Sequence, residues 1–240
     1  VSIISTGTSG LGGTVSLVDI DATGDNQVVG VSTSAVAGLQ FVSIQVRGLG
    51  DVTVAGIDAT GTAVDPNTQT SNVEIISDTG NVLLGDVDAV NTVFVQAASG
   101  TITDNNAGST NVMATKLDAR AQDLVGDAAD SVLNNPGATG FDALETAVGD
   151  ISAVTTGANA DVAIDNVGAV TVSNIEPSAG QPAALWIRST DSITVTALAG
   201  LGSAAENDSV ALIATSGNVT LPDSGDAATT GAADIETTGT

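Results

Sequence analysis

The sequence predicts an all-β fold, a parallel β-solenoid (β-helix) with an irregular middle section. Apolar residues make up 42% of the chain, yet it holds only one Trp, three Phe and no Tyr. The core must therefore consist of Val, Ile, Leu and Ala, and only a thin core can do without aromatic rings at its centre. The 28 Gly residues and the abundant Thr, Ser, Asn and Asp indicate many short strands separated by turns.

One unit recurs along the chain: a Gly or Asp, a strand in which apolar and polar residues alternate, and often an Asp-Ala ending. Its full form stands at 13–22, 50–59 and 80–89, and shorter forms stand at 100–103, 168–172, 191–195 and 217–221. A second alternating strand precedes several of these units, at 73–75, 93–95, 162–164 and 210–212. Alternation with a period of two places Val, Ile and Leu on one face and the polar residues on the other.

The spacing of the units favours a solenoid over other repeat folds. Successive units begin roughly 20 to 37 residues apart, with one gap of about 68 residues. Propeller blades keep a nearly constant length, whereas a solenoid accepts loops of any length at its corners while its strands stay stacked. One unit cannot bury its apolar face alone, so each is expected to stack on the next. The two open ends of such a rod can pair with further strands.

Three regions follow from this spacing: solenoid coils at 1–110, a less regular section at 111–160 and solenoid coils at 161–240. The middle section allows two interpretations. Apolar residues within 116–134 fall at helical spacing, which is typical of an amphipathic helix. Alternatively, 112–119 and 123–125 are strands. The strand interpretation is favoured, so the section is expected to hold less regular coils or a short helix or loop insertion.

Two runs around this section carry a resemblance to a known family. Residues 143–153 read Ala-Leu-Glu-Thr-Ala-Val-Gly-Asp-Ile-Ser-Ala, and 162–172 read Val-Ala-Ile-Asp-Asn-Val-Gly-Ala-Val-Thr-Val. They resemble the repeats of filamentous-haemagglutinin-like large bacterial exoproteins; the similarity covers about 111–175, and the remainder shares only the Gly-x-Val-Thr-Val unit. The resemblance implies a right-handed parallel β-helix in a secreted or cell-surface fibre that reaches, adheres or assembles. The family's secretion domain has no counterpart in these residues, so we expect a segment of a larger protein.

The charge balance and the missing residue types exclude most catalytic and nucleic-acid-binding chemistry. Four Lys and Arg against 28 Asp and Glu give a formal net charge of −24, which repels nucleic acid and anionic lipid. No apolar run is long enough to cross a bilayer, so no direct membrane insertion is expected. The absence of His and Cys removes Ser-His-Asp triads, thiolate nucleophiles and zinc sites. We therefore expect no enzyme; because two carboxylates suffice to hydrolyse a glycan, a carbohydrate-binding or carbohydrate-active β-helix is the alternative.

Two Asp-x-Asp pairs are the candidate metal ligands. Asp19 with Asp21, and Asp86 with Asp88, each place two carboxylates on one face of a strand, and a stacked neighbour can double their number. Clustered hard oxygen ligands suit Ca²⁺. The alternative is that these acids are solvated and keep the rod soluble. The solvated interpretation is favoured, so no cofactor is expected, and calcium is the alternative.

Phe94, Trp186 and Arg188 are the candidate interface residues. Val93 and Val95 are expected to point inward, which turns Phe94 outward. Arg188 cannot lie unpaired in an aliphatic core, so its strand must turn Trp186 and Arg188 outward. Exposed rings predict a contact with a neighbouring fibre or a glycan; alternatively, a loop or corner covers each ring.

Together these observations predict a non-catalytic structural or adhesive repeat segment of a bacterial extracellular fibre or cell-surface protein. It is expected to stack end to end or within a longer chain, through self-association or contact with neighbouring repeats, and to meet a glycan or cell-surface ligand. The acidic, Lys-poor composition agrees with a secreted location.

Overall fold

The computed structural model describes residues 2–6, 15–22, 27–34, 41–59, 70–126, 142–157, 161–176, 184–197, 209–221 and 235–236, with side chains from Ile44 onward except at a few strand ends. In these segments the chain forms strands and turns without a helix. The strands join into one 18-stranded sheet, and each strand pairing in it is parallel. The prediction of an all-β protein with parallel strands is confirmed.

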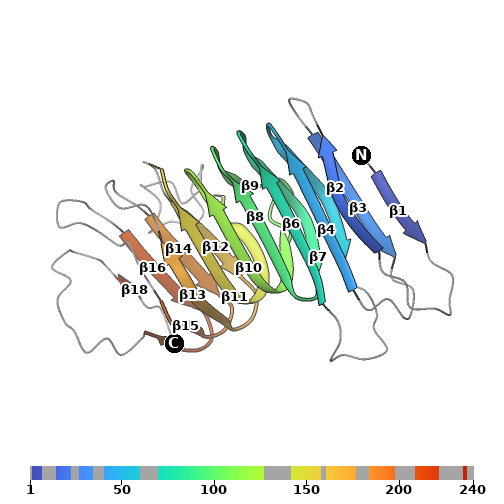
Figure 1. Cartoon of the computed structure of the whole chain (residues 1–240). Coiled ribbons are helices and arrows are strands. Elements are labelled where there is room, and N and C mark those ends of the chain that lie inside the picture. The colour runs from blue at the N-terminus through green and yellow to red at the C-terminus, as the bar shows by residue number, and fades with distance from the viewer. Residues whose placement is uncertain are drawn as a thin grey trace.

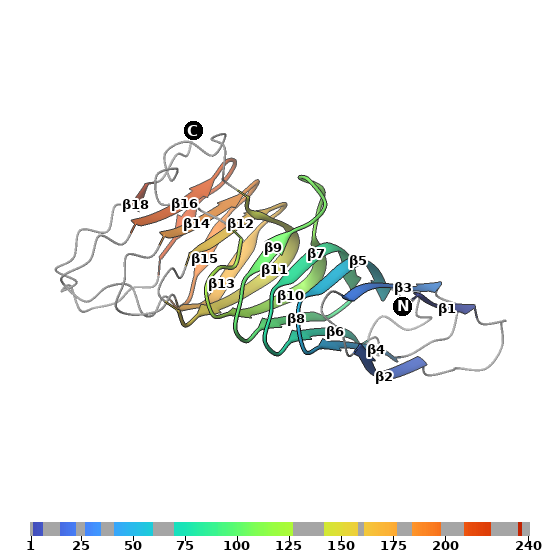
Figure 2. The same ribbon diagram turned by 90° about the horizontal axis from the view of Figure 1, so that it is seen from above.

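The strands lie in two rows that run side by side along the stack (Figures 1 and 2). The first row contains β1 (Ser2–Thr6), β3 (Gln27–Ser34), β5 (Val52–Ala59), β7 (Val82–Ala89), β12 (Val162–Asn166), β14 (Ala184–Ser189), β16 (Ser209–Ala214) and β18 (Ile235–Glu236). The second row contains β2 (Val15–Ala22), β4 (Phe41–Gly48), β6 (Thr70–Ser77), β8 (Thr92–Ala97), β13 (Val170–Glu176), β15 (Ile193–Val195) and β17 (Val219–Thr220). Successive strands of the chain therefore alternate between the rows.

Two long strands belong to both rows. The first residues of β10 (Val112–Ala121) pair with β7 and its later residues pair with β8. In the same way, β11 (Leu144–Thr155) pairs first with β12 and then with β13. β9 (Ile102–Asp104) pairs with the start of β7 and therefore lies at the same level as the first residues of β10. The strand interpretation of 112–119 is thus confirmed, and the helix does not form over β10.

A single register column links successive levels of the first row. Its members, each paired with the next, are Gln27, Val52, Val82, Ile102, Val125, Val162, Leu185, Val210 and Ile235. The chain interval between partners ranges from 20 residues, between Val82 and Ile102, to 37 residues, between Val125 and Val162. We call each step of this column a rung; neighbouring parallel strands lie about 4.8 Å apart. Loops of unequal length therefore leave the stacking register intact.

Aliphatic side chains fill the space between the rows. The members of the first column from Val52 to Leu185 are each 0% exposed, and Val210 is 3% exposed. Facing them, a column of the second row is equally buried: Ile44, Val73, Val93, Leu117, Ile151, Val172 and Val195. Both columns belong to one continuous hydrophobic cluster. Each rung adds one residue to each of these two columns. The space between the rows is therefore filled by aliphatic side chains, in agreement with the predicted thin aliphatic core.

The glycine of the recurring unit has a steric reason. A Cβ added at Gly80 would lie 2.5 Å from the backbone nitrogen of Asp51, and one at Gly100 would lie 2.6 Å from the carbonyl oxygen of Gly80. Only Gly allows the backbone of one rung to come this close to the backbone of the next. The following residue secures the corner: the Asn81 amide donates to Asp51 Oδ1 at 2.7 Å, and the Thr101 amide donates to Asn81 Oδ1 at 3.0 Å.

The structure tests the remaining predictions about the fold only in part. Within 123–125 only an isolated bridge at Val125 forms, and 127–134 lies outside the described residues. The first column crosses both the 110/111 and the 160/161 boundaries, while the division into three regions stays a prediction. The described residues offer no helix with the length and hydropathy needed to cross a membrane.

Candidate functional site

Three strands of the first row bring a group of charged side chains together on their outward face. Glu145 of β11 is the register partner of Asp165 of β12, which is the partner of Arg188 of β14. Each follows an inward aliphatic residue, so alternation turns all three away from the core. Arg188 Nε donates to Asp165 Oδ1 at 2.9 Å, and its Nη2 pairs with Asp165 Oδ2. We call this set the Glu145 column.

Glu145 has the most perturbed environment in this column. Its Oε2 is buried without a hydrogen-bond partner among the described residues. Burial raises the pKa of the Glu145 carboxyl from 4.5 to about 7, and repulsion from Asp104, Asp142 and Asp165 acts in the same direction, while a backbone hydrogen bond opposes it. A carboxyl of this kind keeps its proton up to about neutral pH.

Arg188 is the cation of the column. Its hydrogen bond to Asp165 raises the pKa of the guanidinium, and the negative charges of Asp165 and Glu145 add to this effect although burial opposes it. Arg188 points away from the aliphatic core, as predicted, and there it pairs with Asp165. Its role in an interface stays a prediction.

Trp186 corrects one expectation. The ring does lie on the face opposite Leu185 and Ile187, but it is 0% exposed rather than exposed. It forms a second hydrophobic cluster with Ala143, Ala163, Ala184 and Ala211, separate from the main core. The prediction of an exposed Trp186 is wrong, and the alternative of a covered ring holds. The ring packs against these alanines, and the Arg188 guanidinium carbon lies 5.5 Å from the ring centroid.

Phe94 lies on the outward face of β8 as predicted, since Val93 and Val95 on either side of it are both 0% exposed. The ring is half-buried. The Arg120 guanidinium carbon lies 5.4 Å from the ring centroid, and Arg120 is itself paired with Asp118, the register partner of Phe94. Part of the ring is therefore covered by a neighbouring cation, and its role as an interface residue stays a prediction.

The candidate calcium ligands are placed in part. Asp86 is exposed and Asp88 is half-buried, and Asp58 of the preceding rung is the partner of Asp88. Burial first, then repulsion from Asp86 and Asp58, raises the pKa of Asp88. The side chains of Asp19 and Asp21 lie outside the described set. Among the side chains that the structure places, no three acidic residues come together as a metal-binding group, so calcium binding stays a prediction.

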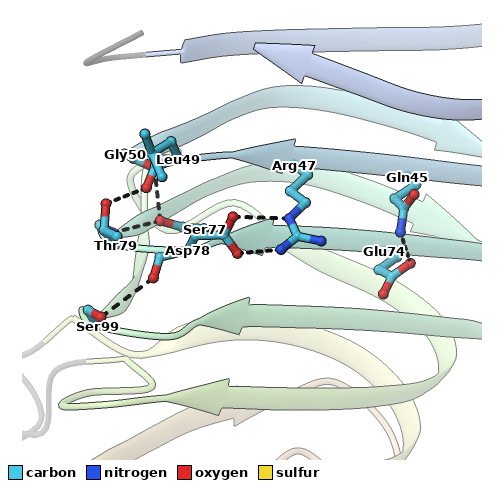
Figure 3. Close-up of polar contacts among 10 residues, drawn as sticks. Gln45, Arg47, Leu49, Gly50, Glu74, Ser77, Asp78, Thr79 and Ser99 are labelled. Carbon is cyan, nitrogen blue, oxygen red and sulfur yellow. Dashed lines mark hydrogen bonds and ion pairs between the residues drawn. The ribbon is translucent and has the colours of Figure 1, made fainter. Parts of the chain in front are cut away.

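The corner after β4, β6 and β8 shows how the outer surface is organised (Figure 3). Ser77 Oγ donates to the carbonyl oxygen of Gly50 at 2.8 Å. Arg47 holds the Asp78 carboxylate through two hydrogen bonds, of 3.1 Å and 2.9 Å. These bonds join residues about 30 positions apart in the chain but one rung apart in the stack. They fasten neighbouring rungs to each other.

Sequence reasoning missed the Glu145 column, although a signal for it exists. The triplets Leu-Glu-Thr at 144–146, Ile-Asp-Asn at 164–166 and Ile-Arg-Ser at 187–189 share an aliphatic, a charged and a small polar residue. Aligning these triplets on one another would have placed the three charges in one column. The unequal loops between them hide the alignment from a search at fixed spacing.

The comparisons with known proteins identify no relative of this chain. No family model matches the chain, and neither a curated protein nor a solved structure matches it.

Proposed function

We propose that the chain is a right-handed parallel β-solenoid that serves as a non-catalytic structural or adhesive segment of a bacterial extracellular fibre or surface protein. The observation that carries this proposal is the first column, in which residues from Gln27 to Ile235 are paired rung by rung in parallel. Parallel strands joined by crossovers are right-handed in about 98% of cases, which supports the handedness.

The distribution of side chains favours a spacer over a reactive surface. From Val52 to Val210 in the first column and from Ile44 to Val195 in the facing column, each rung contributes one aliphatic residue, so the stack can be lengthened without changing its cross-section. The outward positions hold mainly small polar and acidic residues, which keep a long surface soluble. The part of the proposal that places the chain in an extracellular fibre rests on the resemblance of 111–175 to exoprotein repeats.

A second candidate, a carbohydrate-active surface, is favoured by one observation. Glu145, with its pKa raised to about 7, adjoins Asp165 in the same column, and glycosidases use a protonated and an ionised carboxyl side by side. The Asp165 carboxylate is held by Arg188, however, and the ring of Trp186 is buried. The structural proposal therefore has the stronger support. A screen for polysaccharide turnover, with the Glu145→Gln variant as control, separates the two.

Electron microscopy of the purified chain tests the structural proposal. Eight rung spacings of about 4.8 Å predict a rod about 40 Å long for one chain, or end-to-end polymers of such rods. Uniform polymers indicate self-assembly, isolated rods of fixed length indicate a stalk, and rounded particles without elongation contradict the proposal.

A matched pair of variants strengthens this experiment. Ile102 is 0% exposed in the first column, and the next residue, Thr103, is half-buried on the outward face. Ile102→Asp is expected to abolish the rods because it buries an unpaired charge between rungs. Thr103→Asp is expected to preserve them.

A further inference from the structure

The 105–110 loop, between β9 and β10, is closed at its base by one buried asparagine. Asn111 is 0% exposed, and its Nδ2 donates to Asp104 Oδ1 at 2.6 Å and to the carbonyl oxygen of Leu84 at 2.9 Å. Inside the loop, the Asn106 amide also donates to Asp104 Oδ1, at 2.7 Å. Asp104 therefore receives donors from both ends of the loop.

The same asparagine is clasped by Glu145 on the next rung. The Glu145 amide donates to Asn111 Oδ1 at 2.9 Å, and the Asn111 amide donates to the carbonyl oxygen of Glu145 at 2.7 Å. The side chain and backbone of Asn111 thus connect Glu145 with Asp104. Any movement of the Glu145 backbone acts directly on the base of the loop.

The groups that face Glu145 are mostly acidic. Asp104 of β9, Asp142 before β11 and Asp165 of β12 each raise the electrostatic free energy of an ionised Glu145. Arg188 of β14 is the cation that faces it, and Asp165 already holds that guanidinium. A backbone hydrogen bond favours the ionised form, but Oε2 is buried without a hydrogen-bond partner among the described residues, so the ionised form is compensated only in part.

We propose that Glu145, Asn111 and Asp104 form a proton-controlled latch on the 105–110 loop, closed while Glu145 is protonated and loosened when it is ionised. Ionisation adds a negative charge beside Asp104, and the resulting repulsion pulls apart the strands that Asn111 joins. The proposal stands independently of the fibre function, because it concerns only the titration of Glu145 and the hydrogen bonds of Asn111.

The direction of the pH effect follows from linkage. The pKa of Glu145 is about 7 in the folded chain against an ordinary 4.5, so the closed form binds more protons than the open form between these values. The closed latch is therefore most favoured at the acidic end of this window and loses stability as the pH rises to about 7. Above that value the contribution of Glu145 no longer changes.

Amide hydrogen exchange of the full chain tests the latch. Protection factors, corrected for the intrinsic pH dependence of exchange, are measured for the amides of Asn106 and Asn111 at about pH 5 and about pH 8. In the wild type they are expected to fall by about tenfold or more, since linkage changes an equilibrium by up to tenfold per pH unit. The amide of Ile193, bonded to the Asn218 carbonyl on a distant rung, serves as the internal reference and is expected to keep its protection.

Two variants make the test specific. Glu145→Gln keeps the shape and removes the titration, so its protection factors at Asn106 and Asn111 are expected to be the same at both pH values. Glu74→Gln, the same change on the outward face of β6, is expected to behave as the wild type. An equal fall in wild type and Glu145→Gln, or no fall in the wild type, overturns the latch.

A third variant keeps the proposal testable if Glu145→Gln does not fold. Arg188→Gln removes the cation that faces Glu145, so the midpoint of the wild-type change is expected to move to higher pH. An unchanged midpoint in this variant also overturns the latch.

Discussion

Six successive positions of one inner column of the first row change from apolar in the first half to polar in the second. Ile57, Val87 and Val112 occupy it on three successive rungs, and Thr146, Asn166 and Ser189 occupy it on the next three. All six side chains are nearly or fully buried, at 0% to 2% exposure. The backbone register is the same in both halves. The halves therefore differ only in the side chains that fill this enclosed position.

In the polar half, hydrogen bonds take the place of aliphatic packing. Asn166 Oδ1 accepts from Thr146 Oγ1 at 2.8 Å and from the Val148 amide at 3.0 Å. Its Nδ2 donates to the carbonyl oxygens of Val167 and Gly168, at 3.3 Å and 3.0 Å. A parallel stack can therefore enclose polar residues at a corner when each polar atom has a partner. Truncation of a side chain is therefore expected to change the free energy of unfolding by different amounts in the two halves.

The largest expected effect is truncation in the polar half. Asn166→Ala removes the Asn166 side chain as a partner of Thr146 Oγ1, the Val148 amide and the Val167 carbonyl oxygen, while the Gly168 carbonyl oxygen keeps Ser189 Oγ. The free energy of unfolding is therefore expected to fall by about 3 kcal/mol. Val87→Ala, one apolar residue of the same column, removes only packing and is expected to lower it by about 2 kcal/mol. Urea denaturation of both variants measures the difference. An Asn166→Ala variant as stable as the exposed-face variant Thr194→Ala would contradict the comparison.

The close approach between rungs predicts the next effect. Gly100→Ala forces a Cβ to within 2.6 Å of the Gly80 carbonyl oxygen, and the rungs must separate to admit it, at about 2 kcal/mol. Gly56→Ala meets only the Asp86 carbonyl oxygen at 3.7 Å, an ordinary contact, so it is expected to leave the melting temperature nearly unchanged. If the two variants have the same melting temperature, the glycine of the recurring unit has no packing role.

The apolar half carries acids on its outer surface, and removing one should stabilise it. Burial and repulsion from Asp86 and Asp58 raise the pKa of Asp88, so the folded chain is destabilised once Asp88 ionises. Asp88→Asn is expected to raise the free energy of unfolding by about 0.5 kcal/mol at neutral pH. The gain should decrease as the pH falls and vanish at about the ordinary pKa of 3.8, as thermal unfolding at two pH values will show. A gain that persists in acid would have another cause.

The smallest effect concerns the outer face of the second row. Arg120 covers the ring of Phe94 and is exposed to solvent, so its cation–π interaction is expected to contribute about 0.5 kcal/mol. A double-mutant cycle with Phe94→Leu and Arg120→Ala measures this coupling directly. A coupling free energy of zero would mean that the contact between Arg120 and Phe94 does not stabilise the fold, which would leave the Phe94 ring available to another partner.

Local patterns predicted the strands, whereas contacts across long loops escaped prediction. Alternation and the preceding Gly were sufficient for β5 and β7, because a strand needs only its own residues to show which face is apolar. The enclosure of Trp186 depends on alanines from β12 and β16, and the Glu145 column depends on register across loops of unequal length. Neither is visible within a single unit. The polar residues Thr146 and Asn166 also break the inward-apolar rule that alternation assumes.

Distances between spin labels along one column test the central claim, the rung-by-rung register, most directly. Asn72, Thr92, Lys116, Asp150, Thr171, Thr194 and Thr220 form an outward column of the second row, and the chain has no native Cys. A label at Asn72→Cys should lie about 24 Å from one at Thr194→Cys and about 29 Å from one at Thr220→Cys, five and six rungs away. Distances that do not increase from the first pair to the second, or that far exceed these values, would contradict the stacked register.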